Sequence, residues 1–154
     1  MSDLIIREAR EGDLEPIVRL HAEDTLGGHG DVWSEETRGA YAAAFQRIVT
    51  SEDHALFVAE RGAEVVGTFQ VSAIPCLTGR GATRVKLEAV QVRADQRSRG
   101  IGAALIAAAE DWARSRGAAF VELTSNVART GSHRFYARLG YAQSHLGFKK
   151  PLRA

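Results

Sequence analysis

The chain has 154 residues, 45% of them hydrophobic and 25% charged, with a formal net charge of +1 at pH 7. This length and composition predict one compact soluble domain over residues 1–154 and exclude a second full domain. Basic residues are scattered apart from Arg93, Arg97 and Arg99, which predicts a local anion site and argues against a nucleic-acid-binding surface.

Cys76 is the only cysteine, so the chain can form no intramolecular disulfide and no cysteine-based zinc site. A reducing cytoplasm fits this cysteine count best. The first residues lack a basic segment followed by an apolar run, and no stretch approaches the roughly 20 apolar residues of a membrane span. We therefore expect a cytoplasmic protein without a membrane partner.

The first third of the chain predicts a short strand followed by two helices. Residues 4–6 are apolar and form the strand, after which Asp13 is placed to cap a helix. The glycine-rich residues 25–31 interrupt the periodicity, and a second helix is expected from about Ser34. The apolar positions of these helices are Leu14, Ile17, Val18 and Leu20 on the first, and Ala40, Tyr41, Ala44, Phe45 and Ile48 on the second.

The middle of the chain predicts three strands. In the third of them, apolar and polar residues alternate, so we expect Glu88 to share a face of the sheet with Val90 and Val92. The three strands cover residues 55–59, 65–71 and 84–92, and a hairpin turn at 61–64 joins the first two.

The remainder of the chain predicts a helix, a strand, a second helix and a closing strand. A right-handed crossover makes the first of these strands parallel to the one before it. The order predicts an α+β domain with a mixed sheet. The four elements are a helix from Ile101 that stops at Gly117, a strand over 119–124, a helix over 130–139 that stops at Gly140, and a strand over 141–149 that closes the sheet.

The turn before the helix at Ile101 carries two glycines and two arginines. The first amides of a helix lack intrahelical partners and point outward with the positive end of the helix dipole, so pyrophosphate is a natural ligand there. Gly100 and Gly102 leave no side chain in the way, and Arg97 and Arg99 can add charge-assisted hydrogen bonds. A solvated turn that needs glycine only for its backbone angles is the alternative.

Residues 90–105 read VQVRADQRSRGIGAAL and resemble motif A of the GNAT acetyltransferase superfamily, with its signature Q/R-x-x-G-x-G/A. The order of the predicted elements resembles that family over nearly the whole chain. The resemblance implies a three-layer α+β fold. Its mixed, mostly antiparallel sheet has six to seven strands, is splayed at the centre and is flanked by about four helices.

The resemblance also implies where acetyl-CoA, the expected co-substrate, is held. Backbone amides of the turn hold its pyrophosphate, and the strand before the turn hydrogen-bonds to the pantetheine arm like an extra strand. Asn126 could bind the pantetheine amides or could only stabilise a turn. The implied cofactor-binding residues are Val90, Gln91, Val92, Arg97, Ser98, Arg99, Gly100, Ile101, Gly102, Ala103 and Asn126.

Residues 132–141 read SHRFYARLGY and resemble motif B of the same superfamily, in which a helix delivers a tyrosine to the cofactor sulfur. Tyr136 occupies that position. Without the resemblance, an aromatic residue on an amphipathic helix is as well explained by core packing.

Amine acetylation poses two proton transfers, because an ammonium must lose a proton and a departing thiolate must gain one. We expect Glu88 to take the amine proton, directly or through water, and Tyr136 to protonate the sulfur in a direct transfer. The Val90 backbone amide is expected to polarise the thioester carbonyl. The alternative for Glu88 is a surface charge paired with Lys86 or Arg84.

The last third of the chain resembles the aminoalkylphosphonate acetyltransferases, through the strings HRFY at 133–136 and GYAQSH at 140–145. His145 either contributes to the site or is a structural histidine of the closing strand. Acceptor choice is expected from the early helices, the loop 27–30 and the basic turn around Arg80 and Arg84. A small-molecule primary amine is the predicted acceptor.

Other readings of the chain remain open at this point. A non-catalytic acyl-CoA sensor or regulatory module is the alternative function, and the presence of both Glu88 and Tyr136 favours the enzyme. Cys76 could carry an acyl group, but no positioned base is visible beside it. The histidines show no compact metal-ligand spacing, so no metal site is predicted. Two copies are expected to pair through the last strands.

Overall fold

The computed structural model describes residues 3–26 and 28–153. Met1, Ser2, Ala154 and Gly27, which belongs to the predicted acceptor loop, lie outside the described residues. The chain forms two compact units, Met1–Leu123 and Thr124–Ala154. The strands are β1 (Leu4–Glu8), β2 (His54–Arg61), β3 (Glu64–Pro75), β4 (Thr83–Val92) and β5 (Phe120–Glu122). The helices are α1 (Leu14–Ala22), α2 (Arg38–Val49), α3 (Thr78–Gly81), α4 (Ile101–Ser115) and α5 (Thr130–Arg138).

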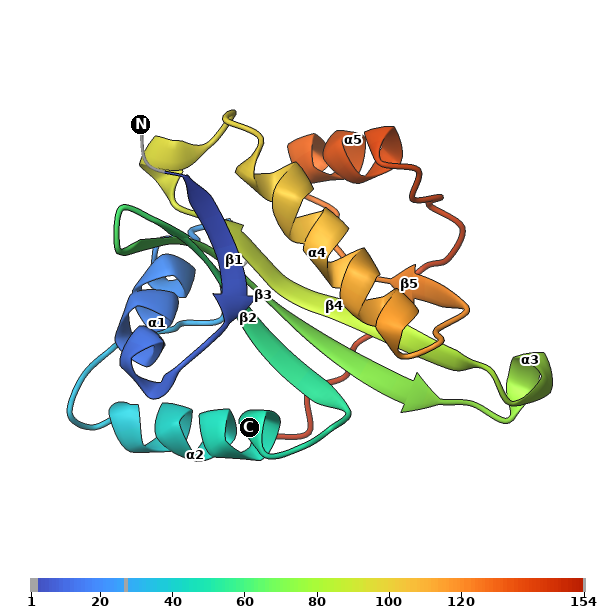
Figure 1. Cartoon of the computed structure of the whole chain (residues 1–154), viewed down its shortest axis with the longest axis horizontal. Coiled ribbons are helices and arrows are strands. Elements are labelled where there is room, and N and C mark those ends of the chain that lie inside the picture. Colours follow the sequence, from blue (N-terminus) through green and yellow to red (C-terminus); the bar gives the residue numbers. More distant parts are fainter. Residues whose placement is uncertain (1–2, 27, 154) are drawn as a thin grey trace. The chain divides into compact units, whose positions relative to one another are not determined.

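The five strands form one sheet in the order β1-β2-β3-β4-β5 (Figure 1). Neighbours from β1 to β4 are antiparallel, and β5 runs parallel to β4 after the crossover through α4. This confirms the predicted mixed sheet of an α+β fold. The predicted six to seven strands are not confirmed, since the described residues form five.

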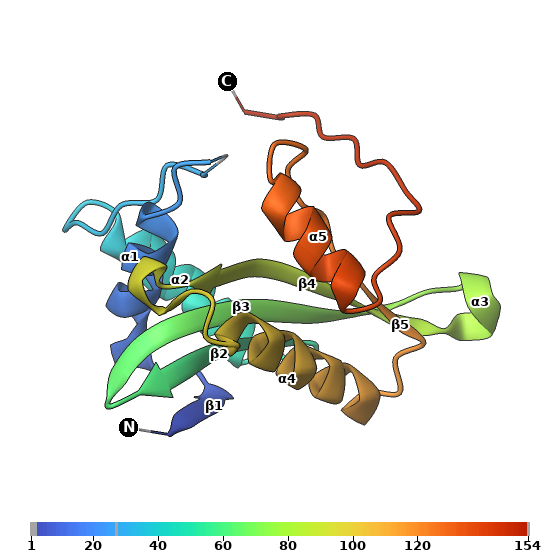
Figure 2. The ribbon, with the colours of Figure 1, turned by 90° about the horizontal axis from the view of Figure 1, so that it is seen from above.

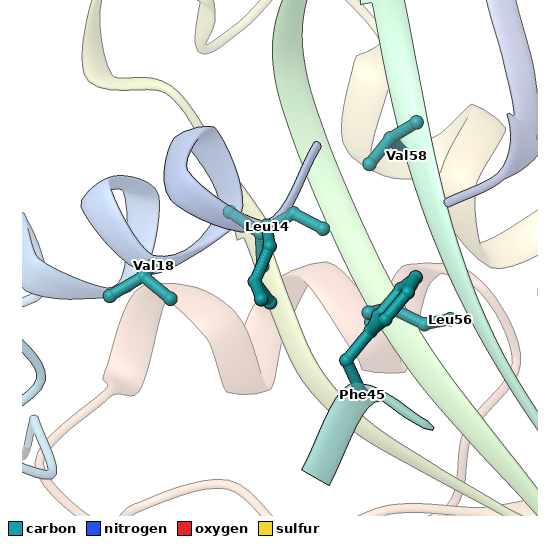
Figure 3. Packing of buried hydrophobic residues seen from close by; sticks show 6 residues of the cluster. Leu14, Val18, Phe45, Leu56 and Val58 are labelled. Carbon is teal, nitrogen blue, oxygen red and sulfur yellow. The ribbon is translucent and has the colours of Figure 1, made fainter. Parts of the chain in front are cut away.

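Helices cover both faces of the sheet in the first unit (Figures 1 and 2). We call the face that carries Leu56 and Val58 of β2 the α1/α2 face, because both side chains are buried against these two helices. Figure 3 shows this packing, in which Phe45 of α2 meets Leu56 below α1. The apolar residues Leu14, Ile17, Val18 and Leu20 predicted for α1 are all buried.

The opposite face, which we call the α4 face, carries Ala59 and Gly67. A Cβ atom built on Gly67 would lie 3.1 Å from Cδ1 of Leu105 and 3.4 Å from Cβ of Ala59. Glycine at this position therefore lets α4 approach the sheet closely. The buried stripe of α4 consists of Ile101, Leu105, Ile106, Ala109, Trp112 and Ala113.

A β-bulge in β4 overturns the predicted orientation of Glu88. Gln70 pairs with Glu88 while Gly67 pairs with Val92, so β4 has one more residue than β3 between these pairs. Ala89 adopts φ 53° at the bulge. Because a bulge reverses the alternation of side chains, Glu88 lies on the α1/α2 face, whereas Val90 and Val92 lie on the α4 face.

The predictions for the start of one helix and for one strand are also wrong. The second helix begins at Arg38 rather than near Ser34, because the Ser34 and Thr37 hydroxyls bond to each other and to nearby backbone groups instead. The strand predicted over 141–149 is absent from the described residues. A segment does not form a strand without a neighbouring strand that pairs with its backbone hydrogen-bonding groups.

None of the helices in the described residues is long and apolar enough to cross a membrane.

Candidate active site

The glycine-bearing turn opens α4, as the sequence predicts. Gly100 lies at the N-cap with φ 80°, and Ser98 also has a positive φ of 62°. The first backbone hydrogen bond runs from the Ala104 amide to the Gly100 carbonyl oxygen, at 3.1 Å. The amides of residues 101–103 precede that bond, so they face outward at the positive end of the helix dipole. This geometry suits an anion.

The arginines around the turn are not equivalent. The Arg97 and Arg99 side chains are exposed, and the Arg97 Nε donates to the Val92 carbonyl oxygen at 3.2 Å. Arg93 instead forms ion pairs with Asp95 at 2.6 Å and Glu64 at 3.2 Å. Its charge is already balanced by two carboxylates, so only Arg97 and Arg99 of the basic cluster are available to an anion at the turn.

The β4 strand leading to this turn has a free edge within the first unit. Its pairing with β5 starts at Arg84 and ends at Lys86, whereas β4 itself continues to Val92. Among the described residues of the first unit, no strand pairs with β4 beyond Lys86 on the β5 side. Main-chain groups on this edge can therefore accept an extended ligand, which is the role expected of Val90 to Val92.

Glu88 lies on the α1/α2 face with its side chain 45% exposed. Its carboxylate Oε1 is 3.7 Å from the Lys86 ammonium, and the neighbouring Arg84 lies 3.2 Å from a Glu122 carboxylate oxygen. The pairing with Lys86 that the sequence offered as an alternative is thus present. An exposed ion pair of this kind is weak and exchanges readily, so Glu88 remains accessible to a ligand.

Tyr136 lies on α5 of the second unit and is half-buried. Its ring meets those of Phe135 and Tyr141 edge to face, with centroids 5.1 Å and 5.9 Å away. Burial raises the pKa of the Tyr136 hydroxyl above its ordinary value, and the Arg129 charge opposes this only in part. The phenol is therefore protonated at neutral pH and can act as a proton donor.

Asn126 stabilises a turn in the second unit. Its side-chain oxygen accepts the Ala128 amide at 2.9 Å, and its carbonyl oxygen accepts the Arg129 amide and contacts the His133 ring nitrogen Nε2, each at 2.9 Å. This is the structural role that the sequence left open. Among the described residues, the side-chain amide nitrogen of Asn126 has no hydrogen-bond partner, so it can donate to a ligand.

Among the remaining candidates, Cys76 and His145 have partners close in the sequence. Cys76 donates from Sγ to the Ile74 carbonyl oxygen at 3.5 Å, and the His145 ring lies 2.7 Å from the Ser144 hydroxyl. Arg80 is exposed at the tip of the β3–β4 hairpin with φ 63°. In the part of the chain that the structure describes, no group of three or more His, Cys, Asp or Glu side chains could hold a metal ion.

Sequence reasoning missed one polar row on the α1/α2 face. His54, Ser72 and Lys86 are cross-strand neighbours on β2, β3 and β4. The His54 Nδ1 and the Ser72 hydroxyl are 2.8 Å apart. Alternation along β4 already placed Lys86 and Glu88 on one face, but the register that adds Ser72 and His54 depends on pairing that no single strand reveals.

Three comparisons relate the chain to known proteins. The family model described as acetyltransferase (GNAT) family matches residues 14–141. An aminoalkylphosphonate N-acetyltransferase of Salmonella typhimurium is 43% identical over 67 residues, which is 44% of this chain and 44% of that protein. The match to this curated relative thus spans less than half of its length.

Solved structures resemble the chain over nearly its full length. A protein named as a transcriptional regulator from Bacillus halodurans C-125 is 37% identical, with a TM-score of 0.93 over 97% of this chain and 100% of that one. The aminoglycoside N-acetyltransferase AAC(6')-Iy in complex with CoA is 21% identical, with a TM-score of 0.81 over 100% of this chain and 97% of that one. The latter likeness is one of fold.

Proposed function

Because the chain belongs to the acetyltransferase (GNAT) family, we propose that it transfers an acetyl group from acetyl-CoA to a primary amine of a small molecule. The observation that carries this proposal is the turn of residues 97–102, whose outward amides and exposed arginines suit a pyrophosphate at the start of α4. A structural neighbour of the same fold contains CoA.

The residues proposed to hold acetyl-CoA supply complementary polar groups. The amides of residues 101–103 and the Arg97 and Arg99 side chains would bind the pyrophosphate. The free edge of β4 at Val90 to Val92 would bind the pantetheine arm, and the Asn126 side-chain amide nitrogen can donate to it. The co-substrate itself brings an activated thioester, and the residues below handle the protons.

In the proposed reaction, Glu88 takes one proton from the acceptor ammonium, directly or through water. The Val90 amide donates to the carbonyl oxygen while the nitrogen bonds to the carbonyl carbon and the carbon–sulfur bond breaks. Tyr136 gives its proton to the sulfur and regains one from the new amide nitrogen. Glu88 then passes its proton to water, so each turnover yields an amide, a thiol and one released proton.

A small amine is favoured as acceptor by a relative. The aminoalkylphosphonate N-acetyltransferase of Salmonella typhimurium is named for such a substrate and shares 43% identity over 67 residues. One hollow of the first unit, with a volume of about 460 Å³, lies between α1 and α2. Both the relative's substrate and this hollow are compatible with several small amines.

A second candidate function is regulatory binding of acyl-CoA without turnover. It is favoured by the Bacillus halodurans protein, which is named as a transcriptional regulator and is 37% identical over 97% of this chain. The same turn would then bind the same cofactor. The two functions differ in whether an amine is consumed.

One experiment tests the proposed enzyme and its residues together. Acetyl-CoA binding is measured by calorimetry, and thiol release is followed with aminoalkylphosphonates, amino acids, polyamines, aminoglycosides and peptides. We expect wild-type turnover with at least one amine, and a fall in kcat of about a hundredfold or more in Glu88→Gln and Tyr136→Phe. Acetyl-CoA affinity should stay within about threefold of wild type in both variants.

The control is Glu52→Gln, an exposed carboxylate between α2 and β2, which should release thiol at the wild-type rate. Variants of Glu88 and Tyr136 that also turn over at the wild-type rate would contradict the assigned roles. Binding of acetyl-CoA without turnover across the whole panel would instead support the regulatory module.

We also propose that two copies of the chain pair through the segment after α5. Leu146, Phe148 and Leu152 are 83%, 95% and 92% exposed there, which is costly for large apolar side chains in water. Light scattering after size-exclusion chromatography should give twice the chain mass, and Phe148→Ser should reduce it. A monomer at every concentration would contradict this proposal.

Residues 1–154 are proposed to act as one functional domain, because the family match at 14–141 runs through both compact units. A cytoplasmic location is supported by the single cysteine, Cys76, which is not in a disulfide.

A further inference from the structure

We propose that Lys86, together with Ser72 and His54, binds an anionic group on the acceptor, so that the acceptor is a short zwitterion with a primary amine and a phosphonate or carboxylate. This inference rests on the proposed acetyl transfer and names its substrate class. It also moves the expected anion site from Arg80 and Arg84 to Lys86, two residues beyond Arg84 on β4.

The three side chains form one cross-strand row on the α1/α2 face. His54 pairs with Ser72 in the register of β2 and β3, and Ser72 pairs with Lys86 in that of β3 and β4. On its other side Lys86 pairs with Glu122 of β5, whose carboxylate is held by Arg84 at 3.2 Å. Directly paired residues of antiparallel strands have Cβ atoms about 4.5–5.5 Å apart. Glu88 lies two residues beyond Lys86 on the same face, so the proposed base and the row are adjacent.

Of the two basic residues Arg84 and Lys86 on this face, Lys86 is the one that becomes available to a ligand. Arg84 is paired with Glu122 at 3.2 Å, and Lys86 is paired with Glu88 at 3.7 Å. When the ammonium of an acceptor takes over Glu88, Lys86 loses that partner. An anionic group on the same acceptor then restores the balance, because it meets Lys86 while the amine meets Glu88.

Replacing the Lys86–Glu88 ion pair by ion pairs with the acceptor costs little free energy. The Lys86 and Glu88 side chains are 37% and 45% exposed, and exposed ion pairs contribute about 0–1 kcal/mol. The Arg84 pair persists beside them and keeps Glu122 from repelling an anion. Arg80 is a weaker candidate, because it stands on the exposed tip of the β3–β4 hairpin rather than in the row.

Ser72 adds a hydrogen-bond donor to this cation. The serine is buried, at 8% exposed, and its hydroxyl lies 2.8 Å from Nδ1 of His54. When Nδ1–H donates to the Ser72 oxygen, the hydroxyl proton is free to donate to an oxygen of the anion. The row then offers an ammonium and a hydroxyl oriented by an imidazole, which suits phosphonate or carboxylate oxygens.

The test compares acceptors that differ only in the anion. Thiol release is measured with 2-aminoethylphosphonate, with 3-aminopropanoate and with propylamine as the neutral reference. We expect Lys86→Gln to raise KM for the two anionic amines about tenfold to a hundredfold, since a charge-assisted hydrogen bond is lost. The kcat/KM for propylamine should fall much less than that for the two anionic amines, and Lys86→Arg should restore most of the lost affinity.

The matched control is Arg114→Gln, which removes one positive charge from α4, where Arg114 is paired with Glu110 and Asp111. It should leave KM for every acceptor unchanged. An equal loss for anionic and neutral amines in Lys86→Gln would overturn the inference, as would an unchanged KM for the anionic amines.

A binding measurement separates this inference from the proposed function. Calorimetry of 2-aminoethylphosphonate with CoA-loaded protein should show binding that weakens at least tenfold in Lys86→Gln, with thermal melting confirming that the variant is folded. If this holds while no amine releases thiol, the zwitterion site stands and the acetyl transfer fails. If the protein acetylates amines but binds 2-aminoethylphosphonate no better than propylamine, the inference fails alone.

Discussion

At the scale of single residues, the best-defined ionic contact lies away from the proposed site. Arg7 on β1 bonds to both carboxylate oxygens of Asp13, at 2.7 Å and 3.0 Å, and to Glu60 on β2 at 2.7 Å. Asp13 also accepts the Arg10 amide at 2.7 Å. The cluster thus joins two strands to the start of α1, and Asp13 is only 8% exposed.

The Arg7 hydrogen bonds lower the pKa of Asp13 below its ordinary value. A lowered pKa stabilises the fold above the pKa of the unfolded state, about 3.9, and this contribution is lost as the pH falls through the folded pKa. We expect Asp13→Asn to reduce the free energy of unfolding by about 2–3 kcal/mol at pH 7, measured by urea denaturation. The difference from wild type should shrink below about pH 4.

Glu15→Gln is the control for this prediction. Glu15 pairs with Arg19 along the exposed surface of α1 at 2.7 Å, so the loss should be about 0.5 kcal/mol or less. A difference for Asp13→Asn that stays constant from pH 7 to acid would contradict the proposed linkage.

Asp13 also illustrates what a sequence can and cannot reveal about one residue. Its place just before α1 was predicted correctly, but its side chain makes no capping bond to that helix. Its partners Arg7 and Glu60 lie on strands, and Glu60 is far away in the sequence. Rules for helix capping consider only residues near the helix end in the sequence, so they do not predict such a contact.

At the scale of elements, the β2–β3 hairpin is built on an unusual turn. Gly62 and Ala63 have φ values of 58° and 64° between the paired residues Arg61 and Glu64. Two positive φ angles define a two-residue type I′ turn, in which alanine is strained and glycine is favoured. The turn was predicted from its glycine, whereas the strain at Ala63 appears only in the backbone angles.

We therefore expect Ala63→Gly to stabilise the protein. Relief of the left-handed strain outweighs the added freedom of the unfolded chain, for a net gain of about 0.5–1 kcal/mol in urea denaturation. The same substitution at Ala43, in the exposed middle of α2, should destabilise by about 1 kcal/mol. A loss of stability in both variants would show that the turn carries no such strain.

Two elements show why strand patterns mislead. The bulge at Ala89 places Glu88 and Val90 on opposite faces, and a bulge at alanine carries no glycine to signal it. The strand predicted over residues 141–149 has no partner strand in the described part of the chain. Both errors concern pairing between strands, which depends on contacts distant in the sequence.

At the scale of the whole chain, the order of elements and the glycine-bearing turn were predictable, because both follow from local periodicity and a local motif. The match of residues 14–141 confirms the family that this motif indicates. The position proposed for the anionic group of the acceptor was not predictable. Its proposed determinants, Lys86 and Ser72, come together only through strand register.

The proposed function requires that an amine receives the acetyl group. Mass spectrometry of amines recovered after incubation with the protein and isotopically labelled acetyl-CoA tests it most directly. We expect 2-aminoethylphosphonate to gain one labelled acetyl group for each thiol released. We also expect Glu88→Gln to form almost none of this product. Thiol release without any acetylated amine, or acetyl-CoA binding with no product from the whole amine panel, would contradict it.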